Sequence, residues 1–386
     1  MKKILRIIGR LNIGGPAIHT VLLTDMMNKD KYESHLVTGS EGATEGSMRY
    51  LAVERGVHLI EIPEMGREIS WIDDFTALWK LIKLMRQMKP DIIHTHTAKA
   101  GALGRVASII ALPFRKKQVY HTFHGHIFHS YFSAKKTKAF ILIEQFLGKF
   151  TREIIAVSEN TGKELLEYNI APKTKIKVIP LGLDLDQFSE CNKFKGELRS
   201  ELSLPNDLIL IGIVARLVSV KGINYFLQSI QILKQKYKNF NVLIVGDGDL
   251  RSELEMQSAE LGLSEIVHFI GYRKDLARIY ADLDIVALSS LNEGLPVSII
   301  EAMSSGKVVV STKVGGVPNL ISDCETGFLC PPKDPVEFAS ALEKAIDQQA
   351  TWDVIGKKAR ESAISRFHVS RLLANIDELY SLSDLF

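Results

Sequence analysis

The 386-residue chain has few cysteines and no long apolar run. Its three cysteines are scattered, with neither the spacing of a zinc site nor a disulfide framework, which favours a reducing cytoplasm. Because no run of about 18 apolar residues occurs, we expect no membrane-spanning helix. Residues 1–9 have a basic start but only a short apolar stretch, so we expect a buried strand there rather than a signal peptide.

The chain also lacks a large net charge, since its 48 Lys and Arg are nearly balanced by 45 Asp and Glu. The balance is uneven along the chain, because residues 1–180 hold 27 Lys and Arg against 17 Asp and Glu. No nucleic-acid recognition motif accompanies these basic residues, so we expect no nucleic-acid partner. A basic first half favours an anionic membrane surface or a polyanion, and a merely solubilising charged face is the alternative.

Apolar strands alternate with amphipathic helical stretches from end to end, which predicts doubly wound parallel sheets and an α/β fold. Strands are expected at 3–8, 35–38, 58–62, 92–96, 118–123, 153–157, 209–214, 241–245, 267–270, 285–288, 308–311 and 327–330. Two sheets of about 180 residues each predict two Rossmann-like domains. Pro180 and Gly182 interrupt the pattern, so we expect domains at 1–180 and 181–368, followed by a last helical stretch in 369–386.

The most informative segment contains two glutamates, Glu293 and Glu301. We expect a buried strand at 285–288, a turn at 289–296 and a helix from Val297. Eight helical residues span about 12 Å, so one carboxylate lies at the loop tip and the other about two turns down. Such a pair can bind two separate diols while helix N–H groups between them face an anion, as a nucleoside diphosphate sugar requires. Carboxylates that hydrolyse glycosides instead lie about 5–10 Å apart across one bond.

The string E-G-L-P-x4-E-A-M-x2-G at 293–306, with Gly315-Gly316 after it, resembles the signature of the retaining family 4 glycosyltransferases. The resemblance covers essentially the whole chain. It implies the GT-B fold, in which two Rossmann-like domains face a cleft and the last helix packs back on the first domain. It also implies that Glu301 holds a ribose diol and Glu293 the sugar hydroxyls. Asn319 departs from the pattern, because the family often has Glu there.

The resemblance assigns the diphosphate to the segment between the two glutamates, which contains Gly294, Leu295, Pro296 and Val297. Arg216 and Lys221 follow the expected strand at 209–214 and match the family's R-x4-K-G, whose cations neutralise the diphosphate. Two cations at the carboxyl end of a strand can stabilise a departing pyrophosphate. From spacing alone, a surface turn explains the two cations equally well.

Gly14 and Gly15 follow the first expected strand and allow backbone N–H groups to approach an anion. The loop lacks G-x-G-x-x-G, so it carries no dinucleotide fingerprint, and a plain tight turn is the alternative. In the family, the matching loop contacts the donor phosphate or the acceptor.

Histidines gather in the first half, at positions 94, 96, 121, 124, 126 and 129. Histidine is a common zinc ligand. However, no cysteine or acidic residue lies among them, so we predict no metal site. Thr122-Phe123-His124-Gly125 resembles the family's T-x-H-G, which implies that His124 contacts the transferred sugar. We expect His121 to be structural, and His126 fits either role.

Two D-x-D strings, at 184–186 and 282–284, imitate the motif of metal-dependent sugar transferases, but their positions favour caps or turns. An apolar stripe at helical spacing lies within residues 71–85. It predicts a crossover helix packed on the first sheet, or alternatively a helix that enters a membrane interface. A second candidate for contact with lipid head groups or a lipid-linked acceptor is the aromatic and lysine-rich stretch at 129–136.

We therefore predict a transferase that moves a hexose-type residue from a nucleotide sugar, with a UDP-sugar preferred, to an acceptor hydroxyl with retained anomeric configuration. The expected acceptor is a lipid-linked or saccharide precursor of a surface polysaccharide. The expected location is the cytoplasm or the inner face of the membrane, and neither cofactor nor metal is expected. A non-hydrolysing UDP-sugar epimerase and a non-catalytic nucleotide-sugar or polyanion-binding protein are the alternatives.

Overall fold

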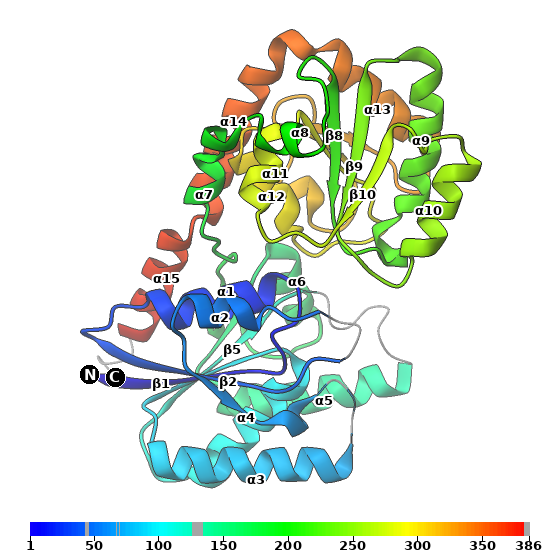
Figure 1. Ribbon diagram of the computed structural model, residues 1–386. Helices are drawn as coiled ribbons and strands as arrows, with labels where there is room; N and C mark the ends of the chain where they lie inside the picture. The colour runs from blue at the N-terminus through cyan, green and yellow to red at the C-terminus, as the bar shows by residue number, and fades with distance from the viewer. Residues whose placement is uncertain (43–45, 67, 69, 126–133, 382–386) are drawn as a thin grey trace. The chain divides into compact units, whose positions relative to one another are not determined.

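The structure, a computed structural model, describes residues 1–42, 46–66, 68, 70–125 and 134–381 (Figure 1). The chain divides into two units. The first contains Met1–Leu183 and the segment from Val369 onward, and the second is Asp184–His368. The division after Leu183 lies three residues beyond the boundary expected from the sequence.

Each unit is a parallel α/β sheet, as predicted. In the described part of the first unit, the strand order is β3-β2-β1-β4-β5-β6-β7. These strands are β1 Lys2–Ile8, β2 Tyr32–Thr38, β3 Leu59–Glu61, β4 Ile92–His96, β5 Gln118–Phe123, β6 Glu153–Ala156 and β7 Ile176–Val178. The central strands β1 and β4 are almost entirely buried because helices cover both faces of the sheet. Only β7 was not predicted, since it is three residues long and none of them is fully buried.

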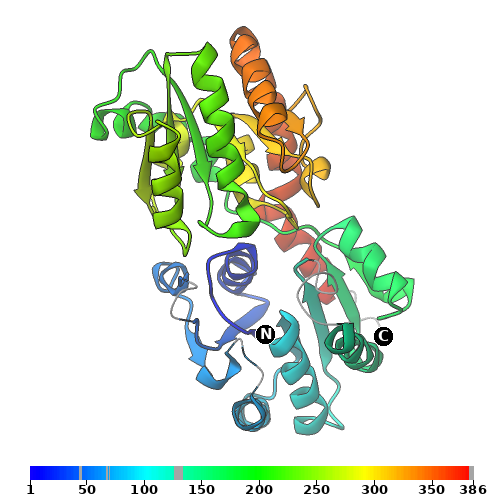
Figure 2. The same ribbon diagram turned by 90° about the vertical axis from the view of Figure 1, so that its right-hand side faces the viewer.

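The helices of the first unit are α1 Gly15–Met26, α2 Arg49–Glu54, α3 Trp71–Met88, α4 Ala98–Ala111, α5 Ala134–Phe150, α6 Glu159–Glu167 and α15 Val369–Ser381. Helix α1 covers the face of the sheet opposite α3 and α4 (Figure 1). Helices α3, α4 and α5 lie side by side (Figure 2). Helix α15 buries Leu372, Ile376 and Tyr380 in one cluster with Ile4 and Ile92 of the central strands.

Helix α3 is present, but the expected apolar stripe does not pack as one face. Ser70 caps the helix by accepting a hydrogen bond from the N–H of Asp73. The buried face consists of Ala77, Leu81 and Met85. The aromatic side chains of the stripe lie outside it, with exposed fractions of 90% for Trp71, 71% for Phe75 and 57% for Trp79. Among the described residues, no helix is long and apolar enough to cross a membrane.

In the described part of the second unit, the strand order is β10-β9-β8-β11-β12-β13. These strands are β8 Ile209–Val214, β9 Phe240–Val245, β10 Val267–Gly271, β11 Ile285–Leu288, β12 Val308–Thr312 and β13 Phe328–Cys330. Its helices are α7 Asp186–Ser189, α8 Glu197–Glu201, α9 Ile223–Lys236, α10 Arg251–Glu260, α11 Leu276–Asp282, α12 Val297–Ser304, α13 Pro335–Asp347 and α14 Trp352–Phe367. One large apolar cluster joins β8 and β9 to α9 and α13.

The aspartates of the D-x-D string at 282–284 accept hydrogen bonds from backbone N–H groups, as expected for residues that cap helices or turns. The Asp282 carboxylate accepts hydrogen bonds from the N–H groups of Gly196, Leu198 and Arg199 at the start of α8. The Asp284 carboxylate accepts from the guanidinium of Arg199 and from the N–H of Leu210. Both carboxylates therefore stabilise the α8–β8 segment.

Candidate functional site

The loop between β11 and α12 brings a predicted cation and a predicted carboxylate together. Lys221 Nζ lies 2.5 Å from Glu293 Oε1, and Ser290 Oγ donates to the same oxygen over 2.6 Å. Only 18% of the Lys221 side chain and 10% of the Glu293 side chain are exposed. A shielded ion pair with a hydroxyl donor holds the carboxylate in one orientation.

The backbone on either side of this ion pair is also joined. Ser289 Oγ donates to the carbonyl oxygen of Lys221 over 2.9 Å, and Leu291 N–H donates to the carbonyl of Val220 over 2.8 Å. Gly222, with φ +59°, permits this approach, because a Cβ there would lie 2.4 Å from the carbonyl oxygen of Ser289. The turn that carries Lys221 is therefore held against the loop that carries Glu293.

The two glycines after β12 lie directly against the Glu293 backbone. A Cβ on Gly315, with φ +51°, would lie 1.8 Å from the carbonyl oxygen of Glu293. A Cβ on Gly316 would lie 1.9 Å from the carbonyl oxygen of Gly294. Gly316 N–H donates to the Glu293 carbonyl over 3.0 Å. Glycine at both positions is thus required for this backbone contact, which sets the position of Glu293.

Helix α12 begins at Val297, after Pro296, and no side chain caps it. The first N–H groups of an α-helix lack intrahelical partners, and the helix dipole favours an anion beside them. Leu295 and Val297 therefore offer backbone N–H donors next to Glu293, whereas Pro296 between them has none, in the part of the chain where the sequence predicts diphosphate binding.

Glu301 lies on α12 and is 7% exposed. The Tyr280 hydroxyl lies 3.0 Å from Glu301 Oε2 and 3.1 Å from the carbonyl oxygen of Ser298. Burial raises the pKa of Glu301 to about 8, while the hydrogen bond from Tyr280 opposes this shift. The carboxyl group is therefore mostly protonated at neutral pH and can both donate and accept a hydrogen bond.

Arg216 follows β8 and its side chain is exposed. The turn that carries it packs on a glycine-containing loop after β9, which was not predicted to take part in the site. A Cβ on Gly246, with φ +140°, would lie 1.9 Å from the carbonyl oxygen of Ala215. The N–H of Leu217 donates to the carbonyl of Asp247 over 2.9 Å. The string Gly246-Asp247-Gly248 after a buried strand is the signal that could have identified this support.

In the first unit, α1 begins at Gly15 with Gly14 as its N-cap, and no side chain caps it. His124 follows β5, and its Nε2 lies 3.0 Å from Nδ1 of His96 at the end of β4. Burial lowers the pKa of His124 to about 3, so its ring is neutral at pH 7. His126 and His129, with the rest of 126–133, lie outside the described residues.

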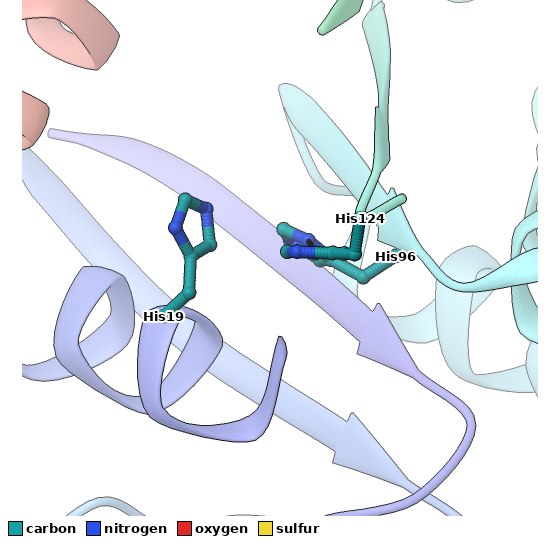
Figure 3. Close-up of side chains that lie close together, drawn as sticks. All are labelled: His19, His96 and His124. Carbon is teal, nitrogen blue, oxygen red and sulfur yellow. Dashed lines mark hydrogen bonds between the residues drawn. The ribbon is translucent and has the colours of Figure 1, made fainter. Parts of the chain in front are cut away.

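Three further histidines lie around His124. Both ring nitrogens of His94 form hydrogen bonds, one with the hydroxyl of Tyr380 and the other with that of Thr122. His121 Nδ1 lies 2.8 Å from Thr95 Oγ1, as suits a structural residue. His19, on α1, was not predicted to join this group, because a single histidine in a helical stretch gives no signal. Its ring centroid nevertheless lies 5.1 Å from that of His124 (Figure 3).

Two family models match the chain on either side of the division between its units. Residues 13–187 match "Glycosyltransferase Family 4", and residues 194–362 match "Glycosyl transferases group 1". The chain belongs to the glycosyltransferases that these models describe. The two matches together span both sheets, so the family assignment applies to nearly the whole chain.

This glycosyltransferase is similar over nearly its full length to the UDP-Gal:alpha-D-GlcNAc-diphosphoundecaprenol alpha-1,3-galactosyltransferase of Escherichia coli. The two are 29% identical over 363 residues, which cover 92% of this chain and 90% of the relative. The capsular polysaccharide biosynthesis glycosyltransferase CapM of Staphylococcus aureus is 28% identical over 323 residues, covering 82% and 83% of the two chains.

Among solved structures, HepE of Anabaena in complex with UDP and glucose superposes with a TM-score of 0.83 at 23% identity, covering 99% of this chain and 100% of that one. Sucrose-phosphate synthase of Thermosynechococcus elongatus superposes with a TM-score of 0.78 at 20% identity, with both chains fully covered. These likenesses show that the glycosyltransferase has the GT-B fold.

Proposed function

We propose that this glycosyltransferase moves a hexose-type residue from a UDP-sugar to an acceptor hydroxyl with retention of anomeric configuration. The observation that carries the proposal is the network of Lys221, Glu293 and Ser290 at the N-terminus of α12, with Glu301 buried further along that helix. The names of the relatives support a UDP-sugar donor, since one is named with UDP-Gal and HepE was solved with UDP-glucose. The assignment to glycosyltransferases favours this reaction over the epimerase and the non-catalytic binding protein.

In this proposal, each part of the donor is bound by a different group of residues. Glu301 binds the ribose diol and Glu293 the hydroxyls of the sugar. Lys221, Arg216 and the N–H groups of Leu295 and Val297 bind the diphosphate. In the free protein, Lys221 is paired with Glu293, so a diphosphate shares a cation that is already held in place.

The first unit supplies two further contacts in this proposal. The uncapped start of α1 at Gly14 and Gly15 binds the donor phosphate or an anionic group of the acceptor. The neutral ring of His124 contacts hydroxyls of the transferred sugar. A neutral imidazole has one donor and one acceptor nitrogen, which suits a hydroxyl better than an anion.

The reaction proceeds by displacement on one face of the sugar. The bond from the anomeric carbon to the phosphate oxygen breaks while the acceptor oxygen bonds to that carbon from the same side. The acceptor proton passes to the departing phosphate. Catalysis then consists of positioning and charge stabilisation, in which Lys221 and Arg216 neutralise the leaving diphosphate without a divalent metal.

A lipid-linked or saccharide precursor of a surface polysaccharide is the proposed acceptor, as the names of the relatives suggest. We also propose that the first unit binds an anionic membrane surface through α3. Trp71, Phe75 and Trp79 are exposed there, and Lys83 Nζ lies 5.6 Å from the centroid of the Trp79 ring. Aromatic rings beside lysines suit the boundary between lipid head groups and acyl chains.

Thermal unfolding of the purified protein with UDP, GDP, ADP or CMP, each with and without Mg²⁺, tests the donor assignment. A ligand that binds only the folded state raises its stability. We expect a rise with UDP that does not require Mg²⁺, and no rise with any nucleotide would contradict the proposal. Incubation of labelled UDP-sugar with and without acceptor then separates transfer from epimerisation, because an epimerase changes the donor without an acceptor.

A further inference from the structure

Three histidines from distant parts of the chain converge in the first unit. His19 lies on α1, His96 ends β4 and His124 follows β5, and the ring of His19 lies edge-on to the other two (Figure 3). One nitrogen from each ring lies within 4.8 Å of one nitrogen from each of the others. His96 is fully buried and His19 is 1% exposed. The pairing of β4 with β5 places His96 and His124 close together, and α1 carries His19 beside them.

The three rings, called the histidine triad below, include buried nitrogens that have no partner among the residues the structure describes. Both ring nitrogens of His19 are buried and make no hydrogen bond to any other described residue. The neighbouring His94 has partners on both nitrogens, so this sheet is able to satisfy a buried histidine. Buried polar groups in native proteins normally have a partner, which points to a ligand that binds these nitrogens.

The chemistry of the triad selects the kind of ligand. An imidazole with its ordinary pKa of about 6.5 is mostly neutral at pH 7, and each neutral ring offers one nitrogen lone pair. Three neutral imidazoles give an anion no charge to bind, but they form a common ligand set for zinc, with a fourth position left to water. We propose that His19, His96 and His124 bind a transition-metal ion of the zinc type.

The ring nitrogens of the three histidines need to move only slightly to reach the separations found in a zinc site. With zinc–nitrogen bonds of about 2.0–2.1 Å, two ligating nitrogens in a tetrahedral site lie about 3.4 Å apart. His96 Nδ1 and His124 Nε2 are already 3.0 Å apart. The widest nitrogen separation in the triad, at most 4.8 Å, has to shorten by up to about 1.4 Å on binding. A rotation of the His19 ring, which makes no hydrogen bond within the described part of the chain, supplies this movement.

Nearby positive charge limits the affinity. The guanidinium groups of Arg6 and Arg371 act on His19, and Arg6 also acts on His96. A divalent cation is repelled by such groups in a low-dielectric interior. We therefore expect weaker binding than at structural zinc sites, with a hydroxide or another small anion as the favoured fourth ligand.

Cobalt(II) is the probe, because its visible absorption distinguishes a tetrahedral nitrogen site from loose surface binding. Tag-free protein is treated with a chelator, dialysed and titrated with Co²⁺. We expect one Co²⁺ per chain with strong visible bands, and displacement of those bands by Zn²⁺. The absence of the bands would overturn the proposal.

Three variants locate the site. His19→Gln and His124→Gln should each abolish the stoichiometric bands, and two variants guard against one that fails to fold, which thermal unfolding identifies. His121→Gln is the matched control, because His121 is also fully buried with an unpaired Nε2 but lies outside the triad. Equal Co²⁺ binding by the wild type and a folded His19→Gln variant would show that the metal binds elsewhere.

One consequence rests on the proposed function. A metal on the triad occupies a nitrogen of His124, which is then no longer free for the transferred sugar. Zn²⁺ should therefore inhibit transfer by the wild type, and the inhibition should be reversed by chelator and be absent in His19→Gln. If Co²⁺ binds as expected but Zn²⁺ leaves transfer unchanged, the metal site stands and the sugar contact assigned to His124 is wrong.

Discussion

The two glutamates of the candidate donor site have different surroundings. Glu293 forms an ion pair with Lys221, whereas Glu301 is buried beside the Tyr280 hydroxyl, and burial raises the pKa of Glu301 to about 8. The two carboxylates of one sequence motif thus differ in partner and burial. Each difference leads to a separate prediction.

Replacing Glu293 with Gln removes the charge but keeps the shape of the side chain. We expect the turnover number to fall about 10- to 150-fold, because a hydrogen bond to a charged group contributes about 1.5–3 kcal/mol. UDP affinity should change little, since Lys221 remains available to the diphosphate. Steady-state transfer kinetics and calorimetric UDP titration measure the two quantities. Glu253→Gln, an exposed residue on α10, is the control, and unchanged turnover in Glu293→Gln would refute the role of Glu293.

The pH dependence of UDP binding should report Glu301. Its pKa of about 8 means that roughly a tenth of the carboxyl groups are ionised at pH 7 and nine tenths at pH 9. Ribose hydroxyls donate to the ionised form and favour it, so UDP affinity should rise about tenfold between pH 7 and 9. This interval lies above the phosphate titration near pH 6. Calorimetric titration of wild type and Glu301→Gln checks this, and an equal slope in both would exclude Glu301 as the source.

The positions of the candidate donor residues in the fold were predictable, but their pairing was not. The sequence predicted that Glu293 lies on a loop and Glu301 on the helix after it, and the structure has both. The sequence could not predict the ion pair of Lys221 with Glu293, because 72 residues separate them in the chain. His19 shows the same limit, since its two histidine partners lie on strands that only the folded sheet brings to α1.

Loops and helices determine how precisely these groups are held. The Gly315–Gly316 loop supports Glu293 through its backbone, and a similar backbone contact holds the Arg216 turn against Gly246.

Helix α3 shows where the periodicity of apolar residues misleads. Its spacing predicted one apolar stripe, yet the sheet covers only the face that carries Leu81, and the aromatic residues remain exposed.

Gly315→Ala should disturb both stability and donor binding. A left-handed φ costs a non-glycine residue about 1–2 kcal/mol, and the clash with the Glu293 carbonyl adds about 1–3 kcal/mol. Gly262→Ala is a matched control, because Gly262 has φ +67° in the same unit and an added Cβ there meets nothing within 4 Å. Denaturant unfolding and UDP titration should show a smaller loss of stability and unchanged UDP affinity for the control. Equal effects of the two substitutions would contradict the proposed support of Glu293.

The exposed face of α3 predicts membrane binding. The triple variant Trp71→Ser, Phe75→Ser and Trp79→Ser should lower the affinity for anionic vesicles at least about tenfold, because burial of one large apolar side chain contributes about 1.5–3 kcal/mol. Its thermal stability should stay near that of the wild type, since all three side chains are exposed. Vesicle sedimentation measures binding, and Met256→Ser, at a 60% exposed residue of the second unit, is the control. Wild-type binding by the triple variant would mean that α3 is not the contact.

At the scale of the whole molecule, the alternation of strands and helices predicted two parallel sheets, and the structure contains both. Among the strands of the described residues only β7 was missed, because Ile-Lys-Val is too short a run to indicate a strand. Each unit places its candidate groups where parallel strands end and helices begin, at Lys221 and Glu293 in one and at Gly15 and His124 in the other. Such positions are the usual ligand sites of open α/β sheets.

The final prediction concerns the complete reaction. Because cationic side chains are proposed to neutralise the departing diphosphate, transfer should persist in excess EDTA, and a UDP-sugar with an α linkage should give an α-linked product. Lys221→Ala should reduce the turnover number about 10²- to 10³-fold, as loss of a group that stabilises transition-state charge does, and added Mg²⁺ should not restore it. Lys358→Ala, an exposed residue on α14, controls for the loss of one positive charge. The anomeric proton coupling in the product and rates with and without EDTA are the measurements. A β-linked product would exclude retention, and loss of activity in EDTA that Mg²⁺ restores would exclude neutralisation by Lys221 and Arg216 alone.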